Sequence, residues 1–359
     1  MGLEDLLTRL EPFAPVISLQ ASQELQGFGR ESGKHITLKR MLSRLAAILN
    51  AIPELKCTEN VPLSSLTRFG IGGPASVLVD ACSEAALAAA IELLCKSKTP
   101  HALIGGGTNL VADDSGFEGV VLRYTANRID IDGPMVRTAA GASLQDLVDA
   151  TIAAGLEGLH TMTGIPGWVG GAIYGNAGAY GHSIHEFVES VRFFDGSSVR
   201  EIANAACEFR YRESIFKRHK DWVVLETTVR LPPGDLAGLR ATADGILKIR
   251  NEKYPPTMQC AGSIFKNLIL AELPETVRAQ VPLKVIREGK VPSAYFLELA
   301  GAKGMVCGGV RVADYHANLI YNAGGGTSQQ VRQLIDTLKR RVMEICGLQL
   351  EEEVQYVIG

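Results

Sequence analysis

One glycine-rich stretch in the middle of the chain carries most of the information about its fold. The stretch is Gly164-Ile165-Pro166-Gly167-Trp168-Val169-Gly170-Gly171-Ala172, and Asn176-Ala177-Gly178-Ala179-Tyr180-Gly181 follows shortly afterwards. It is long, apolar and almost free of side chains capable of chemistry. Because glycine allows a backbone to come close to a ligand, the stretch suits packing against a large flat ligand. A tight crossing of backbones in the core would use the same residues, so both interpretations stay open at this point.

The composition of the whole chain is that of a globular protein unusually rich in glycine. Glycine accounts for 38 of 359 residues, which is about 11% against a usual value near 7%. Hydrophobic residues make up 46% and charged residues 21% of the sequence, which excludes a disordered chain, collagen and a coiled coil. The 36 basic and 39 acidic residues nearly cancel, so we expect no nucleic-acid partner.

Neither a membrane segment nor a metal site is expected from the sequence. No stretch approaches the roughly 18–20 uncharged apolar residues that span a bilayer, and residues 1–15 do not have the pattern of a signal peptide. The seven cysteines are scattered and never form a Cys-x-x-Cys pair, and the histidines show no metal-ligand spacing. This pattern favours a reducing compartment, and we therefore expect a cytoplasmic protein.

We divide the chain into an N-terminal extension of unknown function, a larger domain with two subdomains, and a C-terminal domain. These parts are residues 1–53, residues 54–235 (subdomains about 54–123 and 124–235) and residues 236–359. The extension ends in an amphipathic helical pattern at Leu38–Leu49. Short strands alternate with helices from about Val61, and Pro232-Pro233-Gly234-Asp235 marks the seam before the last domain.

Local patterns predict where individual helices and strands begin and end. Ser83 and Ser143 stand where they can cap helices that run to Cys95 and Gly155. A capping-box pattern precedes a final helix; its residues are Thr327 and Gln330, and Gly347 ends the helix. Strands are predicted at 77–79, 102–104, 120–122, 135–139 and 348–358, with a β-rich region at 188–231.

Two further glycine motifs lie nearer the N-terminus. Gly105–Asn109 directly follows a predicted strand, and its successive backbone N–H groups could form an anion nest, with a tight turn as the alternative. Gly70–Ala75 matches the pattern G-x-G-x-x-A. Because Pro74 interrupts that motif and no buried strand precedes it, we reject a Rossmann dinucleotide site there.

Seven segments together, in one order, point to a known enzyme family. They are Thr67–Ala75, Gly105–Leu110, Gly164–Gly181, Tyr211–Lys217, Ala261–Asn267, His316–Asn318 and Leu350–Val354. Through them the chain resembles the UDP-N-acetylenolpyruvoylglucosamine reductase family over residues 61–359. The spacing after Arg212 is similar to the family's second type, which lacks an extra tyrosine-bearing loop over the substrate diphosphate. The resemblance implies an α+β protein, with a two-subdomain FAD-binding fold of the vanillyl-alcohol-oxidase (PCMH) type and a C-terminal α+β substrate-binding domain.

The same resemblance implies the activity. It is that of an NADPH-dependent flavoprotein oxidoreductase, which reduces UDP-N-acetylglucosamine enolpyruvate to UDP-N-acetylmuramate in peptidoglycan precursor synthesis. Hydride passes from NADPH to bound FAD and then to the methylene carbon of the enolpyruvyl group. The expected partners are small molecules only, and we expect a monomer.

Such a reaction needs two functional groups around the enolpyruvyl unit, and the resemblance adds a third. Hydride addition places negative charge on the neighbouring carbon and its carboxylate, so a cation and a proton donor are required. Arg212 suits the first need because a guanidinium matches a carboxylate with paired donors. By resemblance, Ser263 is the proton donor. Also by resemblance, Glu353 polarises the developing enol or orients the serine proton.

The acidic run before the C-terminus offers more than one glutamate for this third role. In an extended strand Glu353 shares a face with Glu351, whereas Glu352 interrupts the apolar face. A bulge would change which of them faces the site. The resemblance favours Glu353, and the choice between Glu352 and Glu353 depends on that bulge.

Binding residues are also implied by the resemblance. Those for FAD are Thr67, Arg68, Gly72, Gly105, Gly106, Gly107, Thr108, Asn109, Ile165, Pro166, Gly170, Gly171 and Ala172. Those for the substrate are Tyr211, Lys253, Lys266, Asn267 and Asn318. Two other functions remain as alternatives: another FAD-dependent oxidoreductase of the same fold, and a non-catalytic regulator that binds a nucleotide sugar.

Overall fold

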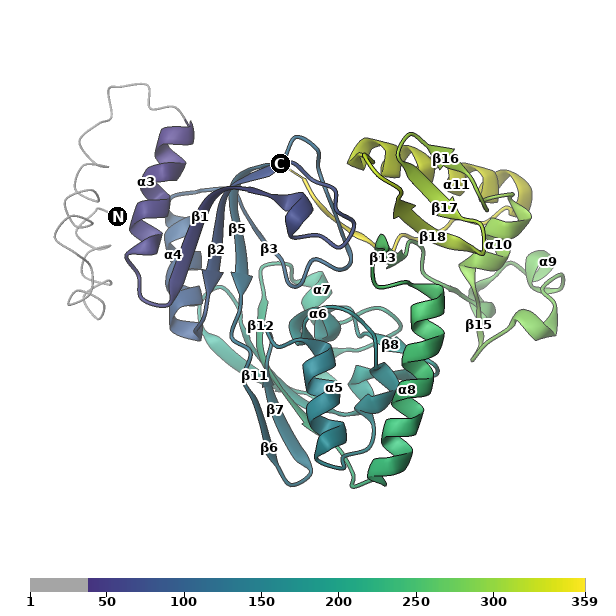
Figure 1. Ribbon diagram of the computed structural model, residues 1–359, viewed down its shortest axis with the longest axis horizontal. Helices are drawn as coiled ribbons and strands as arrows, with labels where there is room; N and C mark the ends of the chain where they lie inside the picture. The colour runs from purple at the N-terminus through teal and green to yellow at the C-terminus, as the bar shows by residue number, and fades with distance from the viewer. Residues whose placement is uncertain (1–37, 359) are drawn as a thin grey trace.

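The computed structural model describes residues 38–358, which form three packed parts in chain order (Figure 1). Residues 1–37 of the predicted N-terminal extension lie outside the described residues. The first part contains a four-stranded sheet in the order β1-β2-β5-β3. Its elements are α3 (Leu38–Asn50), β1 (Leu55–Pro62), β2 (Pro74–Ala81), α4 (Glu84–Lys96), β3 (His101–Leu103), β4 (Leu110–Ala112) and β5 (Phe117–Tyr124).

The first sheet is buried on both faces. Val77 and Val79 of β2 face the core that α3 and α4 cover, whereas Leu78 faces a second cluster on the other side, as the two-residue repeat of a strand requires. Leu45 and Leu49 of α3 are almost fully buried in the same core. Residues 38–50, predicted as part of the extension, therefore belong by packing to the first part.

The second part is a five-stranded antiparallel sheet in the order β11-β10-β12-β7-β6. Helices α5, α6 and α8 lie beside it in Figure 1. Its elements are β6 (Ile129–Asp132), β7 (Met135–Ala139), α5 (Leu144–Ala153), η3 (Leu159–Met162), α6 (Val169–Tyr174), β8 (Gly178–Ala179), β9 (His182–Ser183), β10 (Val188–Phe194), β11 (Val199–Ala203), α7 (Ile215–Arg218), β12 (Val223–Arg230) and α8 (Leu236–Lys253).

Helix α8 packs with the second part although the sequence assigned it to the C-terminal domain. Its buried residues Leu239 and Ala243 belong to the same core as α5. By packing, α8 therefore lies with the second part. The domain boundaries predicted from the sequence stay a prediction.

The third part is a four-stranded antiparallel sheet, β13-β18-β17-β16, with α10 and α11 packed on it. Its elements are β13 (Gln259–Ser263), β14 (Leu268–Ile269), α9 (Glu275–Arg278), β15 (Lys290–Val291), α10 (Ser293–Leu299), β16 (Val306–Cys307), β17 (Val310–Ala313), β18 (His316–Asn322), α11 (Ser328–Cys346) and β19 (Gln355–Val357). The apolar stripe of α11 is buried in this core.

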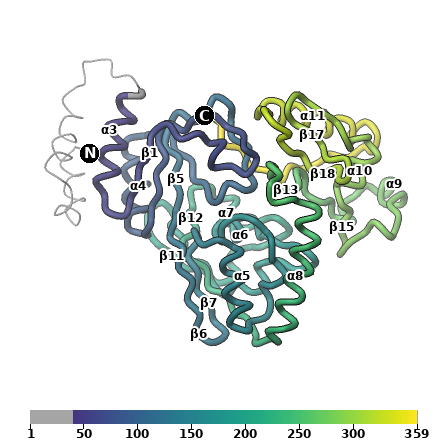
Figure 2. Tube along the Cα trace, in the orientation of Figure 1, coloured from purple at the N-terminus to yellow at the C-terminus, as the bar shows by residue number. Residues whose placement is uncertain are grey.

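The C-terminal segment returns to the first part, as Figure 2 shows. Strand β19 pairs in parallel with β4, so Gln355 lies opposite Leu110. A second link is Asp114, which accepts hydrogen bonds from the first backbone N–H groups of α11. These contacts fix the third part against the loops of the first.

The predicted helix ends are confirmed by their hydrogen bonds. Ser83 and Ser143 accept from the third residue along, and Thr327 forms a full capping box with Gln330. Gly347 ends α11 at φ 64°. The strand predicted at 348–358 was too long, because only Gln355–Val357 forms a regular strand. The reason is that residues 351–353 pair instead with the segment after β13.

Residues 38–358 contain no helix long and apolar enough to cross a membrane. Within the same range no group of three or more His, Cys, Asp or Glu side chains is arranged to hold a metal ion. All seven cysteines are free thiols.

Candidate active site

Three loops of the first and second parts meet at one place. The Thr108 hydroxyl donates to the Pro166 carbonyl at 3.3 Å, and the Arg68 N–H donates to the Gly107 carbonyl at 3.0 Å. A Cβ on Gly107 would lie 1.7 Å from the Leu66 oxygen, and its φ is +66°. We call residues 66–68, 105–109 and 165–172 the glycine cradle. Only glycine fits at residue 107, because the loops touch there.

Other glycines of the cradle leave backbone open. A Cβ added at Gly105 or Gly171 would meet no heavy atom within 4 Å. Neither glycine is therefore required by packing inside the chain, which is the arrangement expected where a backbone approaches a ligand. Of the other predicted cofactor residues, Thr67 is buried with its hydroxyl on the Ile71 carbonyl, and Gly72 packs against Leu63 and Ala112.

Asn109 connects the glycine cradle to the C-terminal segment. Its side-chain Nδ2 donates to the Glu353 carbonyl at 2.9 Å, and its own carbonyl accepts from the Gln355 N–H at 2.9 Å. The Glu353 N–H donates in turn to the Ile264 carbonyl at 2.7 Å. The backbone of Glu353 is thus hydrogen-bonded to Ile264, the residue that follows Ser263, and to Asn109 of the glycine cradle.

Arg212 reaches the same place from the loop before α7. Its Nε donates to Glu353 Oε1 at 2.7 Å, and its Nη2 donates to the Gly178 carbonyl at 2.9 Å. The two side chains of the ion pair are 23% and 22% exposed. Arg212 has φ +57°, a backbone conformation that residues other than glycine rarely adopt. The contacts of the surrounding loops therefore hold the residue in it.

The alternation predicted for the acidic run is confirmed at Glu353. Glu353 faces Arg212, whereas Glu352 turns away and pairs with Lys339 of α11 at 2.9 Å. Glu351 lies on the same face as Glu353 and contacts Lys266. In this segment Glu353, and not Glu352, therefore contacts Arg212.

Lys266 is buried between two carboxylates. Its Nζ lies 2.6 Å from Glu213 and 2.5 Å from Glu351. Burial alone would lower the pKa of Lys266, but the hydrogen bonds to both carboxylates outweigh it and raise the pKa. The charged amine therefore links the loop of Glu213 to the C-terminal segment through two ion pairs.

Asn318 and Asn267 hold the backbone that follows Ser263. Asn318 accepts from the Phe265 N–H at 2.9 Å and donates to the Phe265 carbonyl at 2.8 Å. Asn267 accepts from the Ser293 N–H, and its own N–H donates to the Tyr211 hydroxyl at 3.1 Å. Asn318 and Tyr211 thus contact the segment 263–267, to which Lys266 and Asn267 themselves belong.

Comparison with known proteins places the chain in a family. Residues 254–357 match the family model described as UDP-N-acetylenolpyruvoylglucosamine reductase, C-terminal domain, and residues 75–200 match an FAD binding domain. The chain is 55% identical over 309 residues to the UDP-N-acetylenolpyruvoylglucosamine reductase of Solibacter usitatus, which covers 86% of this chain and 99% of that protein. The chain belongs to the UDP-N-acetylenolpyruvoylglucosamine reductase family.

Two further members of this reductase family are similar to the chain over most of its length. The reductase of Anoxybacillus flavithermus is 33% identical over 302 residues, covering 83% of this chain and 93% of that protein. The crystal structure of UDP-N-acetylenolpyruvylglucosamine reductase from Thermus caldophilus superimposes with a TM-score of 0.65 at 26% identity, covering 84% of this chain and 99% of that chain. The resemblance and the α+β fold expected from the sequence, an FAD-binding domain followed by the family's C-terminal domain, are confirmed. This reductase-family chain is therefore an oxidoreductase with an FAD-binding domain.

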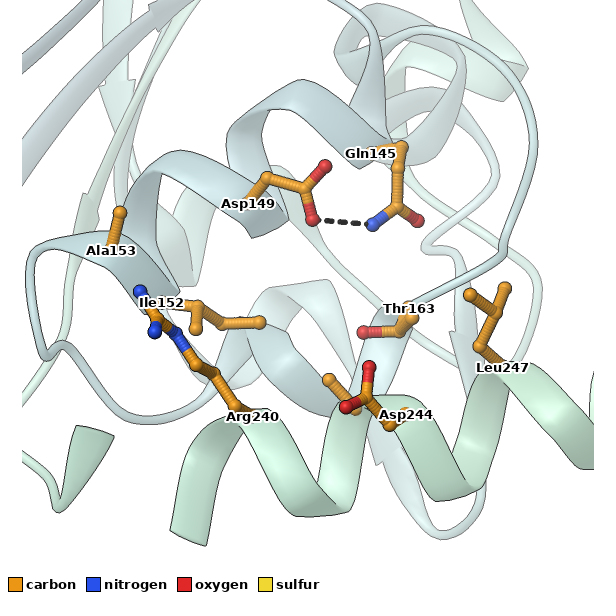
Figure 3. A pocket seen from close by; sticks show the side chains of 9 residues that line it. Gln145, Asp149, Ile152, Ala153, Thr163, Arg240, Asp244 and Leu247 are labelled. Atoms are coloured by element: carbon orange, nitrogen blue, oxygen red, sulfur yellow. Dashed lines mark hydrogen bonds between the residues drawn. The ribbon is translucent and has the colours of Figure 1, made fainter. Parts of the chain in front are cut away.

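The pocket drawn in Figure 3 is not the site predicted for this reductase. It lies between α5 and α8 and is lined by residues such as Gln145, Asp149 and Arg240, none of which was predicted for the site. Gln145 Oε1 accepts a hydrogen bond from the Gly164 N–H at 2.7 Å, so the pocket borders the beginning of the glycine-rich stretch.

Two residues that were not predicted for the site contact residues that were. Tyr254 places its hydroxyl 3.2 Å from Ser263 Oγ. The backbone carbonyl of Asn176 accepts a hydrogen bond from Arg212 Nη1 at 3.5 Å. Asn176 has φ 43°, a value that asparagine tolerates better than most residues. Its place in the glycine-rich stretch was a usable signal, whereas nothing in the pattern around Tyr254 pointed to Ser263.

Proposed function

We propose that this family member reduces UDP-N-acetylglucosamine enolpyruvate to UDP-N-acetylmuramate, with FAD as bound cofactor and NADPH as co-substrate. The observation that carries the proposal is the meeting of Arg212, Glu353 and the Ser263 segment beside the glycine cradle. The Arg212–Glu353 ion pair and the backbone next to Ser263 meet there, although they come from distant parts of the chain.

The glycine cradle fits a flavin nucleotide. Gly105 and Gly171 have open space where a Cβ would stand, and successive backbone N–H groups suit a pyrophosphate. Residues 105–109 and 165–172 would hold the cofactor, with Thr67, Arg68 and Gly72 supporting the loops around it. When bound, FAD supplies hydride transfer between NADPH and the substrate's methylene carbon.

Arg212 and Glu353 form the charged side of the proposed site. The ion pair at 2.7 Å fixes the guanidinium, so a planar cation is available where the substrate carboxylate gains charge. Glu353 orients that cation. It is also the group that orients the serine proton or polarises the developing enol.

Ser263 is the proposed proton donor. It ends β13, and Gly262 before it would admit a Cβ without contact, so the space beside the serine is open. A serine hydroxyl can act as an acid here because the carbon that accepts its proton is strongly basic after hydride addition.

The proposed substrate residues fall into two groups. Tyr211, Lys253 and Asn267 would contact the nucleotide sugar. Lys266 and Asn318 have their polar atoms bonded to protein groups, and they would act by holding the surrounding segments.

We place the enzyme in peptidoglycan precursor synthesis, as a cytoplasmic monomer whose partners are small molecules. The free state of all seven cysteines supports a reducing compartment. The calculated net charge of −3 gives no support to a nucleic-acid partner.

The visible absorbance of the purified protein tests this function. The protein is expected to be yellow, to lose its flavin absorbance when NADPH is added anaerobically, and to regain it when the enolpyruvyl substrate follows. Absence of extractable flavin would defeat the cofactor assignment. If NADPH leaves the flavin oxidised, another FAD-dependent oxidoreductase is favoured, and binding of the nucleotide sugar without turnover would favour a regulator.

A further inference from the structure

Tyr254 has no role in the proposed reaction so far, yet its hydroxyl lies 3.2 Å from Ser263 Oγ. The residue directly follows α8, and nine positions separate it from the serine. Its hydroxyl is the one side-chain hydrogen-bond partner recorded for the Ser263 hydroxyl in the part of the chain that the structure describes. The proposed proton donor is thus in contact with a second ionisable hydroxyl.

The ring of Tyr254 is held from several sides. It packs against the small core cluster that contains Cys260, Ala313 and Leu319. Lys253 Nζ lies 5.1 Å from the ring centroid, and Arg250 Cζ lies 5.7 Å from it. Both distances are within the range of a cation–π contact. The packing fixes the ring, and the two cations place positive charge around it.

We propose that Tyr254 is a positioning residue that orients the Ser263 hydroxyl and returns a proton to it during the reaction. This inference rests on the proposed function, because it takes Ser263 as the donor to the substrate. It assigns a task to a residue that neither the motifs nor the comparisons single out.

The proton transfers balance. The Ser263 O–H bond breaks as its proton forms the new C–H bond at the substrate carbon next to the carboxylate. The Tyr254 O–H bond breaks in turn, and its proton restores the Ser263 hydroxyl. A phenol is a stronger acid than an aliphatic alcohol, so this second transfer is downhill. The Tyr254 phenolate then takes a proton from solvent water.

Tyr254→Phe tests the proposal because it keeps the ring and its cation contacts and removes only the hydroxyl. Flavin reduction by NADPH should stay at the wild-type rate, and flavin reoxidation by the enolpyruvyl substrate should slow by about tenfold or more. The dissociation constant of UDP-N-acetylmuramate should not change. The matched control is Tyr315→Phe, which removes a nearby hydroxyl that donates to the Lys253 carbonyl at 2.9 Å instead of to Ser263; its reoxidation should match that of the wild type.

Two further readouts separate a proton relay from a merely structural effect. In the Ser263→Ala background, adding Tyr254→Phe should change the residual reoxidation rate no further, since the tyrosine acts through the serine. In mixtures of light and heavy water, the wild-type reoxidation rate should curve with deuterium fraction, because two protons move, and should become linear in Tyr254→Phe.

Wild-type reoxidation rates in Tyr254→Phe would overturn the proposal. Equal slowing of both half-reactions, or a further loss in the Ser263→Ala background, would also overturn it, because the residue would then act elsewhere. Failure of the proposed function is recognised separately, since the wild-type flavin would not be reoxidised by the enolpyruvyl substrate at all, and the inference would fall with it.

Discussion

Arg212 Nε lies 2.7 Å from Glu353 Oε1, although 141 positions separate the two residues in the chain. One partner comes from a loop of the second part and the other from the segment that returns from the third part. The ion pair can therefore form only when these parts are assembled. A site built in this way couples correct docking of the C-terminal part to the position of its cation.

Arg212→Lys should slow the reaction of the enolpyruvyl substrate more than it affects binding of FAD. Lysine keeps the positive charge but cannot hold Glu353, the Gly178 carbonyl and a substrate carboxylate with a planar fork. We expect roughly a 100-fold loss in the rate of flavin reoxidation, measured by stopped-flow absorbance. The control is Arg218→Lys, whose side chain pairs with Glu208 at the surface. Unchanged reoxidation in Arg212→Lys would remove this residue from the site.

Ser263→Ala should separate the two half-reactions. Removal of the hydroxyl leaves the β13 backbone pairs intact, so bleaching of the flavin by NADPH should proceed as in the wild type. Reoxidation by the enolpyruvyl substrate should fall by about 10²–10⁴-fold, because the carbon loses its proton donor. Ser190→Ala, on the sheet of the second part, serves as control. An equal loss in both half-reactions would contradict the assigned role.

The choice between Glu352 and Glu353 shows how far the sequence could go. A two-residue alternation predicted that Glu353 and Glu352 point to opposite faces of the segment. This is correct even though only residues 355–357 form a regular strand. The alternation survives because residues 351–353 remain extended while they pair with residues 264–266. The local backbone repeat therefore predicted which side chains share a face, whereas the absence of a bulge that would exchange Glu352 and Glu353 could not be predicted from it.

Side-chain contacts that depend on the tertiary path of the chain could not be predicted in the same way. The position of Tyr254 at Ser263 depends on the direction in which the chain leaves α8. The commitment of Lys266 to Glu213 depends on how a loop of the second part meets the third. Neither relation leaves a repeat or a motif in the sequence. Likewise, the amphipathic pattern of α3 predicted a helix but not that it would complete the core of the first sheet.

Gly171→Ala should weaken FAD binding without weakening the fold. The added Cβ meets no protein atom within 4 Å, and alanine in place of a helical glycine should leave the flavin-free protein unchanged or more stable by up to about 1 kcal/mol. The methyl group would occupy space proposed for the cofactor. We expect the FAD dissociation constant to rise about tenfold or more, a change of roughly 1.4 kcal/mol, measured by fluorescence titration of the apoprotein.

Gly107→Ala is the matched comparison from the same cradle. Its Cβ would stand 1.7 Å from the Leu66 oxygen at φ +66°, so this variant should lose about 2 kcal/mol or more of unfolding free energy even without FAD. If Gly171→Ala destabilised the flavin-free protein as much as Gly107→Ala does, the open space at residue 171 would not be a ligand site.

His316 should make the stability of the protein fall in acid. Burial, followed by the positive charge of Lys253, lowers its pKa to about 4 in the folded chain, whereas an unfolded histidine titrates near 6.5. Its buried Nδ1 has no hydrogen-bond partner among the described residues. Between these two pH values only the unfolded chain binds the proton, so the unfolding free energy falls as the pH drops through this window.

His316→Gln removes this titration and should therefore flatten the pH dependence. From about pH 7 to about pH 4.5 the variant should lose roughly 2 kcal/mol less unfolding free energy than the wild type, measured by urea denaturation at each pH. His101→Gln, at an exposed position on β3, should follow the wild-type curve. The experiment tests whether burial of the His316 ring causes the loss of stability in acid. This ring lies beside Tyr254, with the ring centroids 6.4 Å apart. Parallel curves for His316→Gln and the wild type would mean that His316 does not carry the acid sensitivity.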